Sequence, residues 1–354
     1  MELFKLLGLG FNILRNKAAV QLYKNCGIDL TYPGMLQAML TNDCNSKCNM
    51  CDVWRNKGKE IPASIWINAL SQLKKACGNY KVCFTGGEVF LKNDVFEIFE
   101  FCHEAKIQFG ITTNGLLLSS ENIMRLLEFH PLNINISLDS LSNEIYQSIR
   151  GVLFLEKVKS NIAFMMIYID KNSLKTKVFF KTVVNSFNLK ELHLLADYAM
   201  QKKVAGITFD PIKRKRKIFL EEKISEFEMM SNIDANILMD AKRRLIELKK
   251  SGYNILNSES DINGWFNKYN NCHKYFCDAS LLRININNEG QIKLCDYTES
   301  YIGNIVEDDI EVILKSKKAK TEKKKLTHCE APCEYCIQRT LSDYYNIFLS
   351  YLRN

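Results

Sequence analysis

Hydrophobic and polar positions follow one another along this chain in blocks that predict repeated strand–helix units. From Met35 onward, short apolar runs of strand length are each followed by a longer stretch with helical spacing. In the first helical stretch, Ile65, Ala69, Leu70 and Leu73 share one side. The predicted strands are 35–40, 82–85, 109–112, 134–138, 177–184 and 205–210, and the predicted helices are 64–76, 95–105, 121–129, 155–167 and 189–202.

Six strand-then-helix units predict a parallel sheet covered by helices. A full barrel needs eight units, so the expected fold is α/β, with a partial (β/α)6 barrel that stays open. In parallel barrels the functional residues lie on loops at the carboxyl ends of the strands. The loops that follow the predicted strands are therefore where we look for chemistry.

Composition and charge are those of an ordinary globular protein. The chain has 354 residues, of which 47% are apolar and 25% charged, and it carries a net charge of +8. This mild charge is compatible with an anionic substrate or a membrane surface, and we expect no nucleic-acid partner. Its 13 cysteines are clustered, which favours metal binding in a reducing compartment, so we expect a cytoplasmic protein. No apolar run approaches the ~18 residues of a transmembrane helix.

The first 17 residues carry a short apolar patch that Lys5 interrupts and that lacks a small-residue cleavage site, so it is not expected to be a signal peptide. On a helix, five apolar residues would share one face: Leu3, Phe4, Leu7, Phe11 and Leu14. Two interpretations stay open for residues 1–17. One is peripheral membrane contact through an interfacial helix, and the other is a helix that closes the bottom of the barrel.

The loop after the first predicted strand reads LTNDCNSKCNMCDVW and holds Cys44, Cys48 and Cys51 in a C-x3-C-x2-C spacing. A structural zinc site normally has four protein ligands, and no histidine or fourth cysteine lies nearby. A cubane cluster usually takes four thiolates, so three would leave one iron open to a small molecule. The spacing therefore predicts a reactive [4Fe–4S] cluster.

These three cysteines resemble the signature of the radical S-adenosylmethionine (SAM) enzymes. The resemblance implies that the open iron binds the amino and carboxylate groups of SAM. Reduction of the cluster, by a donor such as flavodoxin or ferredoxin, would then cleave SAM to methionine and a 5′-deoxyadenosyl radical. The residue before the third cysteine is often aromatic in the family and is Met50 here. Methionine is apolar and adaptable, so we expect it to keep the packing against adenine.

Polar motifs follow the next strands. Gly86 and Gly87 would allow the backbone to approach a ligand closely, and the Glu88 carboxylate could pair with an ammonium group. In the family this element holds the amino group of SAM; its usual proline is replaced by Val89 here.

Four more candidates follow: Asn114, Ser137 and Asp139 lie at the later strand ends, and Arg150 follows a short helix. The resemblance implies that Asn114 meets the ligand, that Ser137 and Asp139 hydrogen-bond a ribose, and that Arg150 lies near the SAM carboxylate or the substrate. The alternatives are a plain strand terminator, a solvated carboxylate and a surface salt bridge. Asp210, after the sixth strand, is either a substrate contact or an ordinary loop carboxylate.

A second set of cysteines lies in the last quarter. Cys277 and Cys295 flank an apparent hairpin with its turn at Asn288–Gly290, and a Gly303-Asn304-Ile305 element and Cys333-x2-Cys336 follow. This resembles the auxiliary-cluster domain called SPASM or, in its short form, twitch. The resemblance implies that Cys277, Cys295, Cys333 and Cys336 ligate an auxiliary [4Fe–4S] cluster. Cys329 and Cys272 are unassigned, a second auxiliary cluster stays open, and zinc is the alternative metal.

The expected organisation is an N-terminal helical extension at 1–33, the barrel at 34–212, a helical linker at 213–271 and the auxiliary-cluster domain at 272–345. The remaining cysteines, Cys26, Cys77, Cys83 and Cys102, are expected to be small buried hydrophobes. The basic runs at 213–217 and 315–325 are expected to be solvated.

The resemblance implies abstraction of a hydrogen atom from a substrate carbon, and an auxiliary cluster would favour a net oxidation. Peptide-modifying relatives often carry a peptide-binding domain before the barrel, and only 43 residues precede Cys44. We therefore expect a small-molecule substrate such as a sugar, aminocyclitol, nucleoside or lipid precursor. One alternative is maturation of a ribosomally made peptide, and another is a zinc-stabilised nucleic-acid-binding module. Cyclases of the molybdopterin-precursor type normally end in a glycine-rich tail carrying arginine, whereas this chain ends in YYNIFLSYLRN, which disfavours them.

Overall fold

The computed structural model describes residues 2–212, 233–266, 276–296 and 298–328. Its centre is a nine-stranded sheet in the order β6-β5-β4-β3-β2-β1-β7-β8-β9. The first six strands pair in parallel, each with its neighbour in sequence. They are β1 (Met35–Thr41), β2 (Lys81–Gly86), β3 (Gln108–Thr113), β4 (Asn133–Ser137), β5 (Lys177–Val184) and β6 (Gly206–Pro211).

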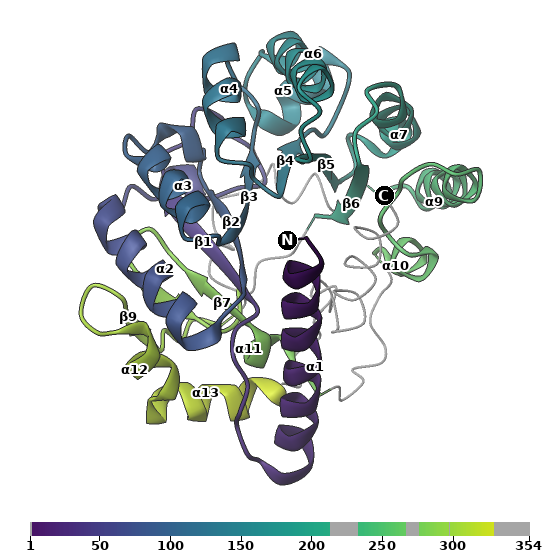
Figure 1. Ribbon diagram of the computed structural model, residues 1–354. Helices are drawn as coiled ribbons and strands as arrows, with labels where there is room; N and C mark the ends of the chain where they lie inside the picture. Colours follow the sequence, from purple (N-terminus) through teal and green to yellow (C-terminus); the bar gives the residue numbers. More distant parts are fainter. Residues whose placement is uncertain (1, 213–232, 267–275, 297, 329–354) are drawn as a thin grey trace.

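Helices cover the outer face of this curved sheet, and Figure 1 shows them as an arc from α2 to α7 around the strands. These helices are α2 (Ala63–Cys77), α3 (Val95–Glu104), α4 (Ser120–Glu128), α5 (Asn143–Arg150), α6 (Leu155–Lys171) and α7 (Leu192–Gln201). Short 3-10 helices lie at η1 (Val53–Arg55), η2 (Val89–Leu91) and η3 (Leu189–Glu191). The alternation confirms the predicted α/β fold and open barrel, and α5 is the short helix that ends at Arg150.

The core between helices and sheet contains most of the residues that the helical spacing placed inward. In α2, Ala69, Leu70 and Leu73 are buried, whereas Ile65 is half-buried and its neighbour Trp66 is fully buried. Three aromatic side chains from β2, α3 and β3 pack together, and the rings of Phe99 and Phe109 stack with their centroids 5.2 Å apart. Burial of such large apolar surfaces is the main stabilising contribution, and it fixes the sheet edge at which the loops meet.

The predicted C-terminal hairpin extends the barrel sheet. It consists of β7 (Arg283–Ile286) and β8 (Gln291–Lys293), which pair antiparallel, and β9 (Gly303–Asn304) follows β8. Strand β7 pairs in parallel with β1, with Met35 opposite Arg283. The region 272–345 was predicted as a separate domain, but its hairpin is therefore part of the same sheet as the barrel. Three further helices surround the hairpin, namely α11 (Ala279–Leu282), α12 (Ile310–Lys315) and α13 (Lys317–Thr327).

The region predicted as a helical linker packs on the other edge of the sheet. Helix α9 (Ala235–Lys250) contacts α7, and α10 (Glu259–Gly264) follows. Between them, Ile255 forms a parallel bridge with Ile207 of β6. The Asn257 side chain accepts a hydrogen bond from the Phe209 amide and donates one to its carbonyl, at 2.8 and 2.9 Å. This part of the chain thus completes the β6 edge, while the basic run at 213–217 lies outside the described residues.

Helix α1 (Glu2–Cys26) is anchored near the amino ends of the strands by its second half. The Arg15 guanidinium donates to the carbonyl of Cys77, at the end of α2, and the buried Asn16 side chain donates to the carbonyl of Tyr32. These contacts support the interpretation that α1 closes the bottom of the barrel, although Leu14 is 67% exposed. No helix among the described residues is long and apolar enough to span a bilayer.

Four cysteines were expected to be small buried side chains. Cys77 and Cys102 are buried and Cys83 is half-buried, but Cys26 is exposed, so the prediction for Cys26 was wrong. Cys26 is the last residue of α1, where the chain leaves the helix before reaching β1.

Candidate active site

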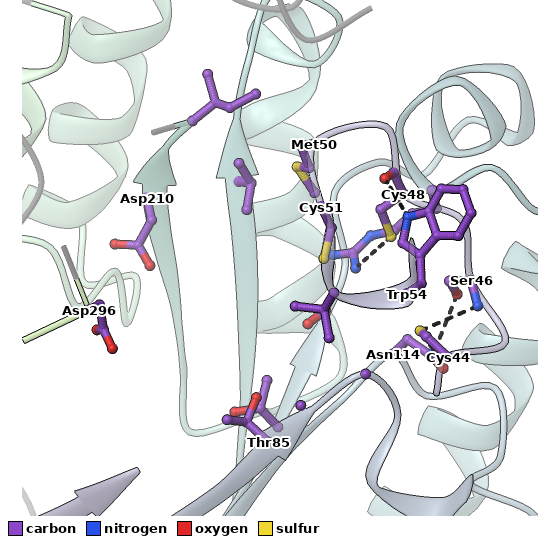
Figure 2. Close-up of a pocket in the computed structure, with 18 of the residues that line it drawn as sticks. Cys44, Ser46, Cys48, Met50, Cys51, Trp54, Thr85, Asn114, Asp210 and Asp296 are labelled. Carbon is purple, nitrogen blue, oxygen red and sulfur yellow. Dashed lines mark hydrogen bonds between the residues drawn. The ribbon is translucent and has the colours of Figure 1, made fainter. Parts of the chain in front are cut away.

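A cavity of about 650 Å³ opens at the carboxyl ends of the strands (Figure 2). One wall is the loop after β1, which contributes Cys44, Cys48, Met50 and Cys51. Further predicted residues at strand ends line it too, namely Gly86, Gly87, Asn114, Ser137, Arg150 and Asp210. Ten predicted residues therefore line a single cavity, as expected for a parallel barrel, whose functional residues lie at one edge of the sheet.

The two glycines after β2 hold the cysteine loop against the sheet. The amide of Gly87 donates to the carbonyl of Thr41, and the amide of Glu88 donates to the carbonyl of Asp43, both at 2.7 Å. A Cβ atom on Gly87 would lie 2.0 Å from the Asp43 carbonyl oxygen, and one on Gly86 would lie 2.2 Å from that of Thr41. Gly86 also has a φ of 138°, which other residues rarely adopt. The close approach that requires glycine is thus to the cysteine loop, where the sequence suggested a ligand.

Glu88 is fully buried, and its carboxylate holds the loop after β3. It accepts hydrogen bonds from the Thr113 hydroxyl at 2.7 Å and from the Asn114 amide at 2.8 Å. The Asn114 side chain then donates to Asn45 Oδ1 at 2.7 Å and to Ser46 Oγ at 3.2 Å, and lies 3.8 Å from Cys44 Sγ. Burial raises the pKa of Glu88 to about 7, although these hydrogen bonds oppose the shift. Glu88 therefore supports the cysteine loop from behind the cavity wall.

The end of α5 forms a third contact with the cysteine loop. The Arg150 and Ile149 carbonyls accept hydrogen bonds from the amides of Lys47 and Asn49, at 3.2 and 3.0 Å. Gly151 follows with a φ of 68°, and a Cβ there would lie 2.5 Å from the Lys47 carbonyl oxygen. The αL glycine that ends the helix is thus also the residue that lets the loop pack against it.

Arg150 is buried and forms an ion pair with the fully buried Asp139, with Nε and Oδ2 2.6 Å apart. The guanidinium Nη1 lies 3.8 Å from Cys48 Sγ. Asp139 therefore faces Arg150 and is not among the described residues that line the cavity, whereas Ser137 is. The alternatives of a solvated Asp139 and a surface salt bridge at Arg150 are both wrong, because both side chains are inside the protein.

The thiols of the loop are in surroundings that suit a metal cluster. Burial raises the pKa of Cys44 to about 11, and burial also raises that of Cys48, where the Arg150 charge partly opposes it. These thiols stay protonated near neutral pH unless a metal displaces the proton. Three donors already point at sulfur. The Ser46 amide and the Asn114 side chain lie 3.4 and 3.8 Å from Cys44 Sγ, and the Arg150 guanidinium lies 3.8 Å from Cys48 Sγ.

Within the described ranges, no three histidine, cysteine or acidic side chains converge closely enough to hold a single metal ion. Three thiols that share one cavity wall without converging are what a four-iron cluster requires, because each thiolate binds a different iron. The donor set contains no histidine or carboxylate, which also agrees with iron and sulfur. The residues present therefore fit a [4Fe–4S] cluster.

The far wall of the cavity carries residues that the sequence did not single out. Figure 2 shows Asp296 and Asp210 across the cavity from the cysteine loop. Lys293, Thr298 and Glu299, which are close to Asp296 in the sequence, also line the cavity. Asp296 pairs with Arg283 at 2.8 Å. The sequence did contain a signal for these residues, because the polar run after Cys295 follows a predicted strand. That this run lines the cavity, however, depends on the pairing of β7 with β1, which the sequence does not show.

The auxiliary cysteines are described only in part. Cys277 and Cys295 are half-buried and belong to the segments that enter and leave the β7–β8 hairpin at the same end. The Cys277 amide donates to the carbonyl of Thr327 at 3.1 Å. That contact brings the end of α13, two residues before Cys329, to Cys277. Cys272, Cys329, Cys333 and Cys336 lie outside the described residues.

Comparison with known proteins now identifies the family. Residues 39–198 match the model of the radical SAM superfamily. A probable GTP 3′,8-cyclase of Methanocaldococcus jannaschii is 30% identical over 226 residues, which cover 60% of this chain and 72% of that protein. The chain belongs to the radical SAM superfamily. It is therefore an enzyme, and its family implies a [4Fe–4S] cluster and SAM as cofactors.

Solved structures agree with this fold. Streptococcus suis SuiB bound to the precursor peptide SuiA superposes with a TM-score of 0.67 at 18% identity, covering 90% of this chain and 75% of SuiB. The enzyme anSMEcpe, with bound SAM and a peptide, superposes with a TM-score of 0.59 at 17% identity, covering 87% of each chain. At these identities the likeness concerns the fold.

Proposed function

We propose that Cys44, Cys48 and Cys51 ligate a [4Fe–4S] cluster and that the enzyme abstracts a hydrogen atom from a substrate bound in the adjoining cavity. The observation that carries the proposal is that three thiols from one loop line the same cavity at the carboxyl ends of the parallel strands. When bound, the reduced cluster and SAM supply a 5′-deoxyadenosyl radical, and the protein contributes binding, orientation and exclusion of competing reactions.

The residues divide into those that face the ligands and those that hold the loop. Met50, Ser137 and Arg150 line the cavity and are the proposed SAM contacts, together with the backbone at Gly86 and Gly87. Two sets of side chains act behind this wall. Glu88 fixes the Thr113–Asn114 turn, and Asp139 fixes Arg150. Glu88 and Asp139 would thus hold Cys44, Cys48 and Cys51 in place without contacting the cofactor themselves.

The substrate that the far wall favours is a small molecule rich in hydroxyl or amino groups, such as a sugar or aminocyclitol. Asp210, Asp296 and Glu299 offer carboxylate oxygens, which accept hydrogen bonds from such groups and attract an ammonium. A nucleoside triphosphate would instead bring several negative charges toward these carboxylates. Among the described residues that line the cavity, the lysine is Lys293, whose Nζ lies 4.4 Å from the centroid of the Tyr301 ring.

A peptide substrate is the second candidate. Its support is the structural likeness to SuiB and anSMEcpe, both solved with a bound peptide. A peptide side chain inserted into the cavity would use the same carboxylate wall. The two candidates differ in size, so fractionated cell extract separates them.

The test adds small-molecule and peptide fractions of cell extract to the anaerobically reconstituted, reduced enzyme with SAM. Stimulation of 5′-deoxyadenosine formation by the small-molecule fraction supports the first candidate, and stimulation by the peptide fraction supports the second. An Asp210→Asn variant, which keeps the side-chain shape, is expected to raise the concentration of stimulating fraction needed for half-maximal rate. An unchanged concentration dependence would remove Asp210 from the proposed substrate site.

We further propose that Cys277, Cys295, Cys333 and Cys336 ligate an auxiliary [4Fe–4S] cluster of the twitch type. The common end of the β7–β8 hairpin and the contact of Cys277 with Thr327 support this set. Such a cluster would supply a place for the electron released when the substrate radical is oxidised. The alternative, structural zinc in these cysteines, predicts zinc and no additional iron.

A further inference from the structure

The buried ion pair between Asp139 and Arg150 holds the Arg150 guanidinium close to the Cys48 thiol. The Asp139 carboxylate is fixed by the Val183 amide, which donates to Oδ1 at 2.7 Å, and its main-chain carbonyl accepts from Asn188 Nδ2 at 2.9 Å. Its Oδ2 holds Arg150 Nε at 2.6 Å, which leaves Nη1 3.8 Å from Cys48 Sγ. The pairing therefore sets the orientation of the guanidinium fork relative to Cys48.

This arrangement is costly in an apolar environment. The side chains of Arg150 and Asp139 are 8% and 0% exposed, and the neighbouring Tyr146 and Ile149 are fully buried. Removing both charges from water carries a desolvation penalty that their mutual attraction has to offset. Low local dielectric also means that the Arg150 charge acts strongly on its nearest neighbours. The sulfur that the Arg150 guanidinium contacts is that of Cys48, a proposed cluster ligand.

Hydrogen bonds to the sulfurs and the local charge are among the main determinants of an iron–sulfur reduction potential. We infer that Arg150, oriented by Asp139, acts through the Cys48 sulfur to raise the reduction potential of the cluster. The reduced cluster carries one more negative charge than the oxidised one, so a guanidinium beside a ligand sulfur favours the reduced form. The inference rests on the proposed function, because it assumes that Cys48 is a ligand.

The test is an EPR-monitored redox titration of the anaerobically reconstituted full chain without SAM, alongside iron and sulfide analysis. Arg150→Gln removes the charge and is expected to shift the midpoint potential to a more negative value. Arg150→Lys keeps the charge and is expected to lie between this variant and the wild type. The matched control is Asp29→Asn, which disrupts another ion pair, Lys323–Asp29 at 2.7 Å, whose side chains are 6% and 18% exposed and which does not line the cavity. The control is expected to titrate like the wild type.

A double variant covers the case in which Arg150→Gln fails to fold because it leaves Asp139 buried and unpaired. Arg150→Gln with Asp139→Asn leaves no unpaired charge, and it is expected to shift the potential in the same direction by a smaller amount. The inference is wrong if these variants bind iron as the wild type does and titrate at the midpoint of the control. A wild type that binds no iron, or shows no cluster signal after reduction, would overturn the proposed function instead.

Discussion

The buried carboxyl of Glu88 makes a prediction about stability that needs no cofactor. Glu88 accepts hydrogen bonds from the Thr113 hydroxyl and the Asn114 amide in the fully buried interior. Glu88→Gln keeps this geometry, since the amide oxygen can accept from Asn114 while the amide nitrogen donates to Thr113 Oγ1. The variant therefore removes the titration of residue 88 with little change in packing.

The size of the effect follows from the pKa. Burial raises the pKa of Glu88 from 4.5 to about 7 in the folded protein. Between these values the folded state binds a proton that the unfolded state has released. The free energy of unfolding therefore falls as the pH rises through this window, by about 3 kcal/mol for the full interval. The contribution is fully present below about pH 4.5 and is lost above about pH 7.

The assay is urea unfolding of the metal-free wild type and of Glu88→Gln at a series of pH values from about 5 to about 8. Subtracting the variant from the wild type at each pH removes the contributions of all other groups. The difference in free energy of unfolding is expected to decrease by about 2 to 3 kcal/mol across the series. A difference that is independent of pH, or that increases with pH, would refute the assignment of a raised pKa to Glu88.

The remaining predictions concern the loop contacts and the auxiliary cysteines. Gly87→Ala is expected to lower the free energy of unfolding by roughly 2 kcal/mol or more and to reduce the iron that the protein retains, because the added Cβ would overlap the Asp43 carbonyl. The control is Gly264→Ala, whose Cβ would meet no atom within 4 Å. Unchanged iron content in Gly87→Ala would contradict the role given to this contact. Cys333→Ala with Cys336→Ala is expected to reduce bound iron from about eight to about four atoms per chain. A folded double variant that forms the same product at the same rate would exclude a part for these residues in the reaction.

Local patterns were sufficient to predict the barrel. Strand β5 has the predicted bounds, Lys177–Val184. Its side chains alternate between buried and half-buried, and this alternation is visible in the order of neighbouring residues in the sequence. The three cysteines of the loop after β1 were found for the same reason, since their spacing is local. The two glycines after β2 were found as well, but the sequence does not show that Thr41 and Asp43 pack against them.

The contacts that organise the site are non-local and could not be read from the sequence. The orientation of Glu88 toward Thr113 depends on the pairing of β2 with β3. The pairing of Asp139 with Arg150 depends on how α5 turns back toward β4. The cavity position of Asp296 requires β7 to join the sheet beside β1, although these strands are far apart in the sequence.

The central claim is that the cluster held by Cys44, Cys48 and Cys51 cleaves SAM. The most direct measurement is 5′-deoxyadenosine formation by anaerobically reconstituted protein with dithionite and SAM. The wild type is expected to form it, Cys51→Ala to lose it, and Cys26→Ala to retain it, since Cys26 is exposed at the end of α1. Deoxyadenosine that persists in Cys51→Ala, or is absent from a wild type with a full complement of iron, would contradict the account.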